Sequence, residues 1–184
     1  MVVVTTIVAM SAPVNSRSDE PGGPGAPVLR SRDWQLDAWR SFLRTHAHLV
    51  RRLEQDLVAH GKVPLATYDV LVQLAEAPDN RLRMSELAQA VLLSRSGLTR
   101  LVDRLQREGL VERRPDPGDA RGLFTVLTPK GRDALRAAAP VHLSGVADLV
   151  VQRLTEPELQ QLRMLMLKLD PDPPGRSGPV FRGG

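Results

Sequence analysis

The chain has no cysteine, and this absence removes several kinds of chemistry at once. Disulfide bonds, thiolate zinc sites and thiol-based redox sensing are all excluded. The sequence also has no Gly-rich phosphate loop and no nucleophile elbow, so we expect neither enzymatic activity nor a cofactor. His46 and His48 do not predict a metal site, because side chains two residues apart on a helix point in different directions.

Long apolar runs are lacking too. No run approaches the roughly 20 residues that a membrane-spanning helix needs. Residues 1–10 are apolar, but no basic residue precedes Arg17, so they do not resemble a secretory signal. We therefore expect a cytoplasmic protein with no membrane partner.

Lysine is scarce, although the chain is basic. Its formal net charge is +4 and its pI is about 10.3, and the only lysines are Lys62, Lys130 and Lys168. Nearly all cations are therefore arginines. This balance indicates a polyanionic partner, which charge alone leaves open among nucleic acid, an anionic membrane surface and acidic small molecules.

The pattern along the chain predicts a mainly α protein with a small β-hairpin. Residues 1–30 and 171–184 are rich in Ser, Pro and Gly, and we expect both to be disordered tails. Apolar residues recur at helical intervals in 31–62, which predicts one long helix, and again in 129–170, which predicts two.

Capping signals place the two later helices. Thr128 with Pro129 indicates a helix that runs as far as Leu154, and Thr155 with Glu158 forms a capping box for the last helix. The terminal helices carry more apolar surface than the small domain between them, residues 63–128, can cover. We call this domain the head. We infer that the terminal helices form a dimerisation region with a second copy of the chain, the alternative being an intramolecular bundle.

Residues 63–128 have the spacing of a helix-turn-helix and then a hairpin. Pro64 suits the first turn of one helix, Ser85 can cap a second and Ser94 a third. The third helix is apolar on one side and polar on the other, with arginines that can bond guanine or phosphate. Its candidate DNA-binding residues are Ser94, Arg95, Ser96, Thr99, Arg100 and Arg104. Such a face also occurs on ordinary solvent-exposed helices.

The segment after the third helix favours the DNA-binding interpretation. Two β-rich runs surround a breaker-rich tip, which predicts a hairpin that serves as a wing. Arg121 lies near the tip, where it can enter a minor groove, and Asp119 is placed to orient it. Arg113 and Arg114 are further candidates for contacts with the DNA backbone. The alternative for Asp119 and Arg121 is an exposed ion pair of little energetic value.

This ordered set of motifs resembles the MarR (multiple antibiotic resistance regulator) family of winged helix-turn-helix regulators. The resemblance covers about residues 33–169. It rests on the segments Met84–Ala88, Ser94–Leu105, Glu108–Arg113, Asp119–Arg121 and Leu127–Gly131. It implies a homodimer that binds a pseudo-palindromic site on double-stranded DNA, with half-sites about 10 base pairs apart.

The resemblance also implies a ligand-responsive repressor, released by a small aromatic or anionic effector. The dimer would have two arrangements that differ in the spacing between its heads. Such an effector must bind one of them more tightly than the other. The candidate lining of its site is Trp39, His46, Tyr68 and His142. The alternative is that these four side chains belong to the core or to an interface.

Two other functions remain open from the residues alone. A winged helix used only for protein contacts would have no salt-dependent affinity for DNA. A non-specific architectural protein would bind any duplex about equally.

Overall fold

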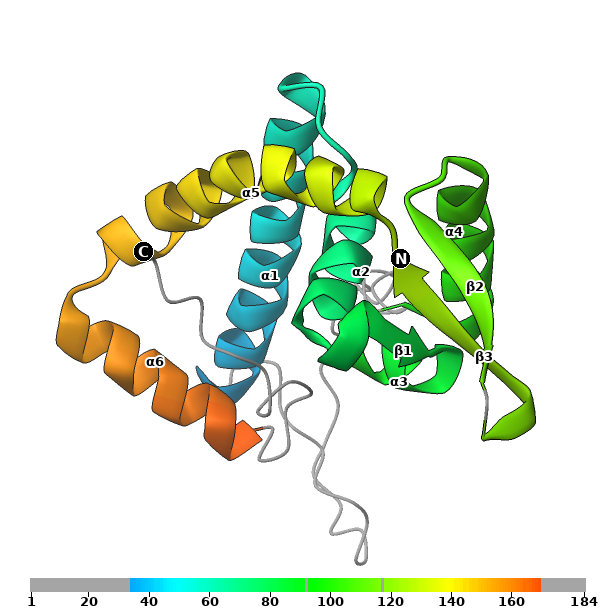
Figure 1. The fold of residues 1–184 in the computed structure, drawn as a ribbon. Coiled ribbons are helices and arrows are strands. Elements are labelled where there is room, and N and C mark those ends of the chain that lie inside the picture. The colour runs from blue at the N-terminus through cyan, green and yellow to red at the C-terminus, as the bar shows by residue number, and fades with distance from the viewer. Residues whose placement is uncertain (1–33, 92, 117, 170–184) are drawn as a thin grey trace, which may run out of the picture. The chain divides into compact units, whose positions relative to one another are not determined.

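The computed structural model describes residues 34–91, 93–116 and 118–169, apart from the side chains of Arg95, Ala120 and Arg121 (Figure 1). The expected tails, 1–30 and 171–184, lie outside the described residues. The chain divides into two compact units, Met1–Thr45 and His46–Gly184.

The long N-terminal helix α1 spans Trp34–Ala59 and crosses the boundary between the units. In the first unit, the rings of Trp39 and Phe42 stack with their centroids 5.9 Å apart, and both side chains are largely exposed. In the second unit, α1 ends at Ala59, and Gly61 just beyond this end has a φ of +63°, which suits a residue without a Cβ. The predicted single long helix is confirmed.

Three helices form most of the head in the second unit. They are α2 (Leu65–Glu76), α3 (Met84–Ala90) and α4 (Arg95–Arg107). Pro64 immediately precedes α2 instead of lying in its first turn, and the backbone N–H of Leu65 donates to Glu54 on α1 at 2.6 Å. A short 3₁₀ helix, Pro78–Asn80, comes after α2.

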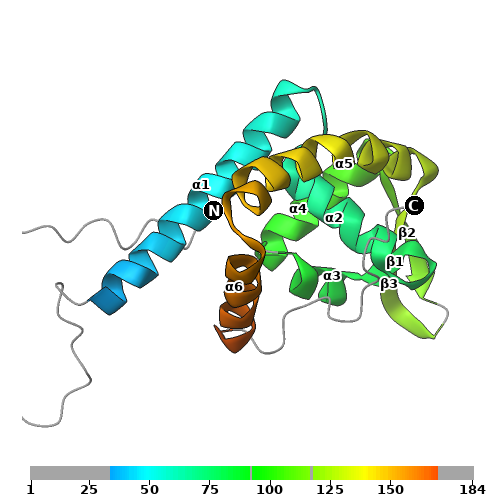
Figure 2. The ribbon, with the colours of Figure 1, turned by 90° about the vertical axis from the view of Figure 1, so that its left-hand side faces the viewer.

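A small antiparallel sheet completes the head. Its strands are β1 (Arg81–Arg83), β2 (Val111–Asp116) and β3 (Asp119–Leu127), in the spatial order β1-β3-β2. Val111 pairs with Leu127 and Arg83 pairs with Phe124. The predicted hairpin is thus confirmed, and Figure 2 shows it extending away from the helices of the head.

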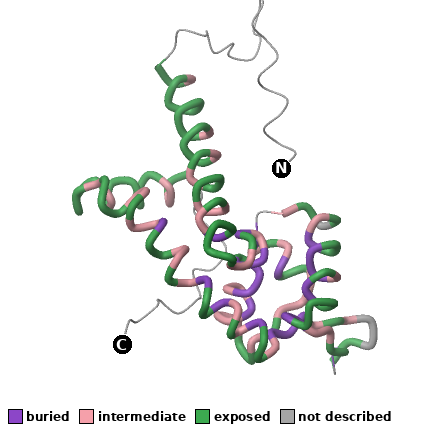
Figure 3. The backbone as a smooth tube through the Cα atoms, turned by 90° about the horizontal axis from the view of Figure 1, so that it is seen from above, coloured by how far each residue is buried: buried purple, intermediate pink, exposed green. Residues whose placement is uncertain are grey.

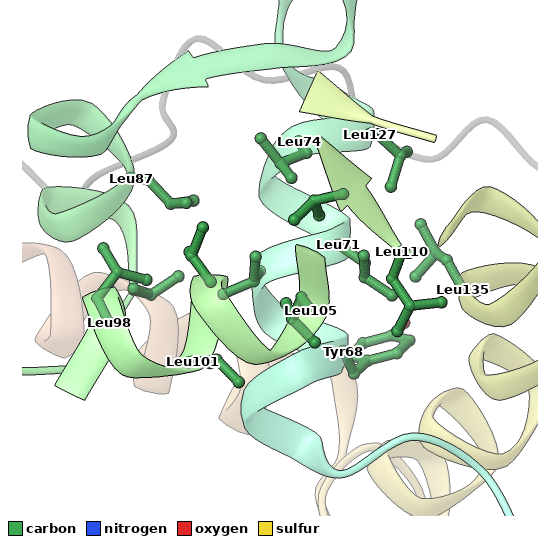
Figure 4. Packing of buried hydrophobic residues seen from close by; sticks show 14 of the residues in the cluster. Tyr68, Leu71, Leu74, Leu87, Leu98, Leu101, Leu105, Leu110, Leu127 and Leu135 are labelled. Atoms are coloured by element: carbon green, nitrogen blue, oxygen red, sulfur yellow. The ribbon is translucent and has the colours of Figure 1, made fainter. Parts of the chain in front are cut away.

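The core of the head surrounds α2. Figure 4 shows Leu71 and Leu74 of this helix facing leucines from α3, α4, β3 and α5. The buried residues gather in this region, as the purple segments of Figure 3 show. One continuous apolar cluster therefore fixes the recognition-type helix α4 against the rest of the head.

Two helices come after the sheet. Helix α5 spans Pro129–Leu149, and its N-cap Thr128 accepts a hydrogen bond from the backbone N–H of Gly131, so the predicted cap is confirmed. Helix α5 ends before Leu154, and a 3₁₀ turn, Val151–Arg153, replaces the predicted last turn. Helix α6 spans Glu156–Leu169.

Two local predictions need correction. Ser85 does not cap α3, because the helix already begins at Met84 and the carboxylate of Glu86 accepts from the backbone N–H of Arg83 at 2.7 Å. At the start of α6, Glu158 accepts from the backbone of Thr155 at 2.8 Å as expected. The Thr155 hydroxyl, however, donates to the same carboxylate and does not cap the helix backbone.

We expected no apolar segment long enough to span a membrane. By the criteria of length and composition, this expectation is wrong. Among the described residues, the segment 129–153, which is α5 with the 3₁₀ turn that follows it, is long and apolar enough to cross a membrane by those criteria. Its first half nevertheless packs in the head, where Leu135 and Ala138 are buried and Arg132 donates to the side chain of Asn80 at 2.7 Å. Length and composition are therefore weak evidence for a membrane span here.

Candidate nucleic-acid interface

The start of α4 is fixed by its N-cap. The Ser94 hydroxyl accepts from the backbone N–H of Gly97 at 3.1 Å, so the predicted cap is confirmed. The Ser96 hydroxyl lies 3.4 Å from that of Ser94, and both residues are exposed. A capped helix N-terminus with exposed hydroxyls and spare backbone donors suits a phosphate group.

One side of α4 is buried and the other side is exposed. Leu98, Val102 and Leu105 are fully buried in the core of the head. Thr99 and Arg100 are exposed on the other side. Within the part of the chain that the structure describes, the Arg100 guanidinium has no hydrogen bond or ion pair, so it is available to an external acceptor.

Arg104 is exposed but already bonded within the head. Its guanidinium lies 3.4 Å from the Thr67 hydroxyl on α2 and 3.8 Å from the carboxylate of Glu108. The contact with Thr67 joins Arg104 to α2. A DNA phosphate would therefore have to share the Arg104 guanidinium with these two partners or replace them.

Arg113 joins the hairpin to the recognition-type helix. Its guanidinium pairs with the Asp103 carboxylate of α4 at 2.5 Å, and its side chain is only 27% exposed. Arg114 is more exposed and pairs with Glu112 on the same strand. Of the two arginines, Arg114 is thus more accessible to a partner.

The turn of the hairpin is organised by Asp116. Its carboxylate accepts from the backbone N–H of Gly118 at 2.8 Å and also pairs with the guanidinium of Arg83. The Gly118 N–H, and then Arg83 and Arg81, lower the pKa of Asp116. Asp119 lies 3.7 Å from Arg83 as well, so β1 contributes a cation to the turn.

Sequence reasoning missed Arg81 and Arg83. Their guanidinium carbons lie 4.7 and 5.7 Å from the centroid of the Phe124 ring, on the strand next to β1. The available signal was their spacing, since residues two apart on a strand share a face. Arg121 and Arg95 belong to β3 and α4, but their side chains are not described, so the predicted pairing of Asp119 with Arg121 stays a prediction.

The four candidate effector-site residues are only partly brought together. The rings of Tyr68 and His142 are in contact, with centroids 4.4 Å apart and planes tilted by 31°, and burial raises the pKa of Tyr68 and lowers the pKa of His142. The Nδ1 atom of His142 is buried without a hydrogen-bond partner among the described residues. His46 is exposed, and Trp39 belongs to the other unit.

The described residues contain no group of three or more His, Cys, Asp or Glu side chains arranged to hold a metal ion. This holds for the described side chains between residues 34 and 169 only.

Together these features define a class: a winged helix-turn-helix protein, with a capped, arginine-bearing helix next to a β-hairpin. Comparisons with known proteins give the family. Residues 62–122 match the family model described as "MarR family". The transcriptional repressor MprA of Escherichia coli K12 is 32% identical over 134 residues, which cover 71% of this chain and 76% of MprA.

Solved structures agree with this match. Sco3205, a MarR family transcriptional regulator from Streptomyces coelicolor solved in complex with DNA, is 36% identical with a TM-score of 0.70. The match covers 82% of this chain and 98% of that one. AbsC from the same organism is 33% identical with a TM-score of 0.71, over 77% of this chain and 95% of AbsC. The chain belongs to the MarR family and is a DNA-binding transcriptional regulator.

Proposed function

We propose that the chain is a homodimeric, ligand-responsive repressor that binds a pseudo-palindromic operator through α4 and the β2–β3 wing. It acts in the cytoplasm and has no enzymatic activity of its own. The observation that carries the proposal is that one side of α4 is buried and the other side is exposed. Its leucines and Val102 are buried in the head, while its hydroxyls and Arg100 are exposed at the end where a helix enters a major groove.

The proposed DNA contacts fall into three groups. The first group is assigned to the major groove and its phosphates and consists of Ser94, Arg95, Ser96, Thr99 and Arg100. Arg104 and Arg114 are assigned to the DNA backbone, with Arg113 acting through its pair with Asp103. Arg121 is assigned to the minor groove at the wing, and Asp119 helps to order the turn beside it.

The proposed dimer rests on exposed apolar side chains of the terminal helices. On α6, Met164 is 61% exposed and Leu165 is 50% exposed, and on α5 Leu143 is 52% exposed. Exposed apolar groups of this size on neighbouring turns of a helix are typical of a protein–protein interface. A two-fold dimer would place two heads on half-sites about 10 base pairs apart.

The proposed effector site is centred on Tyr68 and His142. The two tilted rings provide an aromatic surface, and the Nδ1 of His142, which has no hydrogen-bond partner among the described residues, provides a polar atom that a ligand can satisfy. A small aromatic or anionic molecule fits this chemistry. It would act as an inducer only by binding the DNA-free arrangement more tightly than the DNA-bound one.

One experiment separates this proposal from its alternatives. Purified protein selects fragments from its source genome, and fluorescence anisotropy then measures affinity for a selected fragment and for scrambled duplex over a series of salt concentrations. We expect tight, specific binding whose logarithm falls steeply with the logarithm of salt concentration. Equal affinity for every duplex would indicate an architectural protein, and no affinity would indicate a protein-interaction module.

A further inference from the structure

The C-terminal end of the recognition helix is held by side chains from the start of α5. Lys130 Nζ donates to the backbone carbonyl of Glu108 at 2.8 Å. The Thr128 hydroxyl lies 2.7 Å from the carbonyl oxygen of Gly109 and 3.0 Å from that of Leu110. Three successive carbonyls just beyond α4 are therefore bonded to two residues at the start of another helix.

The backbone reinforces this junction. The N–H of Thr128 donates to the Leu110 carbonyl at 3.2 Å, and Leu110 in turn donates to the carbonyl of Leu105 inside α4 at 2.9 Å. A Cβ atom built on Gly131 would lie 2.1 Å from the Leu110 carbonyl oxygen, so the first turn of α5 is in direct contact with this segment. Little room is left for α4 to move independently of α5.

We propose that Thr128 and Lys130 are positioning residues, which make the orientation of the recognition helix follow that of α5. The inference rests on the proposed function, in which α5 belongs to the dimerisation region. Because the junction is rigid, the packing of the two copies in the dimer would set the distance between their recognition helices. Movements of α5 would be transmitted to α4 through the hydrogen bonds at the C-terminal end of α4.

The placement of Lys130 argues against a direct role in DNA binding. Helix α4 enters a groove with its N-terminus, and its 13 residues span about 20 Å at 1.5 Å per residue. Lys130 lies at the opposite end, and its ammonium group is engaged by the Glu108 carbonyl. A cation is also favourable there because the C-terminal end of a helix carries partial negative charge.

The test is Lys130→Met, which removes the ammonium group and keeps an apolar stem of similar length over Gly109. Affinity is measured for the selected operator and for operators whose half-sites are moved one base pair closer or further apart. We expect the variant to bind the selected operator about fivefold more weakly, which is about 1 kcal/mol and close to the net value of a typical hydrogen bond. We also expect the wild-type penalty for altered spacing to shrink in the variant, because its heads are held less rigidly.

Salt dependence and thermal unfolding separate positioning from other roles. A positioning role leaves the salt slope unchanged, whereas loss of a phosphate contact would reduce it by about 0.9 and overturn the proposal. Lys130→Arg should restore both affinity and spacing preference, since it retains a cationic donor. Lys62→Met, in the α1–α2 connection, is the charge-matched control and should leave spacing preference intact.

Two further outcomes are decisive. If Lys130→Met lowers the unfolding temperature but keeps the wild-type affinity and spacing penalty, the junction is merely stabilising and the proposal is wrong. If wild-type protein itself shows no specific operator or no spacing preference, the proposed dimeric repressor function fails instead.

Discussion

Arginines of the head fall into two groups that composition alone cannot separate. Arg83 and Arg113 are committed to carboxylates, at Asp116 and Asp103 respectively. Arg100 is exposed and has no such partner among the described residues. The first group orders the wing and its connection to α4, while the second is available to DNA.

Arg121→Ala tests the wing at the scale of one residue. If Arg121 contacts a phosphate, its loss should weaken operator binding and reduce the salt slope by about 0.9. Fluorescence anisotropy over a series of salt concentrations provides both values. Arg136→Ala, on an exposed side of α5, is the control. An affinity and slope equal to those of the wild type would remove Arg121 from the interface.

Gly131→Ala tests the close contact between α5 and the end of α4. The added methyl group would overlap the Leu110 carbonyl oxygen and approach Leu127 Cδ1 within 2.8 Å. Because both neighbours are held in the core, we expect a loss of about 1–3 kcal/mol in the free energy of unfolding. Urea denaturation measures this value. Wild-type stability would show that the junction can open at little cost.

Sequence patterns predicted the helix caps at Ser94 and Thr128 correctly, whereas the interactions that they missed depend on distant partners. Ser94 and Thr128 cap helices as their local context indicates, because capping needs only residues within one turn. Arg83 bonds to Asp116, 33 residues later in the chain, and no local pattern predicts that pair. The same holds for Lys130 and the Glu108 carbonyl.

At the scale of elements, the wing depends on a strand that sequence reasoning missed. Strand β1 has only three residues, and it forms through pairing with β3 more than 40 residues away. A run this short is indistinguishable from a loop in sequence. Helices α1 and α4 were predictable because their apolar patterns extend over several turns. The hairpin was predictable because its apolar residues lie in two adjacent β-rich runs.

Asp116→Asn tests the turn of the wing through its pH dependence. The folded protein lowers the pKa of Asp116, chiefly through the Gly118 N–H and then Arg83. This carboxylate therefore stabilises the fold above its unfolded pKa of about 3.9, and the contribution is lost as pH falls through the lower folded value. We expect the variant to be less stable than wild type at pH 7, and the difference to shrink below about pH 4.

Urea unfolding from pH 7 to pH 3 measures that difference. Asp133→Asn, which alters an exposed carboxylate on α5, serves as the control and should track the wild type. A difference for Asp116→Asn that stays constant over the whole range would argue against an ionised Asp116 as the organiser of the turn.

At the scale of the whole molecule, the terminal helices expose apolar side chains that the described residues leave uncovered. Leu165→Glu places a charge on the exposed apolar side of α6. If this side is buried in a dimer, the charge costs about 3 kcal/mol or more, which raises the dimer dissociation constant about 100-fold. Sedimentation velocity over a range of concentrations measures that constant.

Gln160→Glu, at an exposed position that lies on a different side of α6 from Leu165, adds the same charge and is the matched control. We expect it to remain dimeric and Leu165→Glu to lose operator affinity together with dimerisation. If Leu165→Glu remains a dimer, α6 does not contribute this side to the interface.

The central claim is that the exposed side of α4 lies in a major groove. Because the chain has no cysteine, a single cysteine can carry a photo-cross-linker without background labelling. Ser96→Cys places it on the exposed side of α4, and Ser144→Cys places it at an exposed position of α5. With operator DNA bound, we predict efficient cross-linking from position 96 to bases of the half-site and almost none from position 144. Cross-linking from position 144 with none from position 96 would contradict the claim.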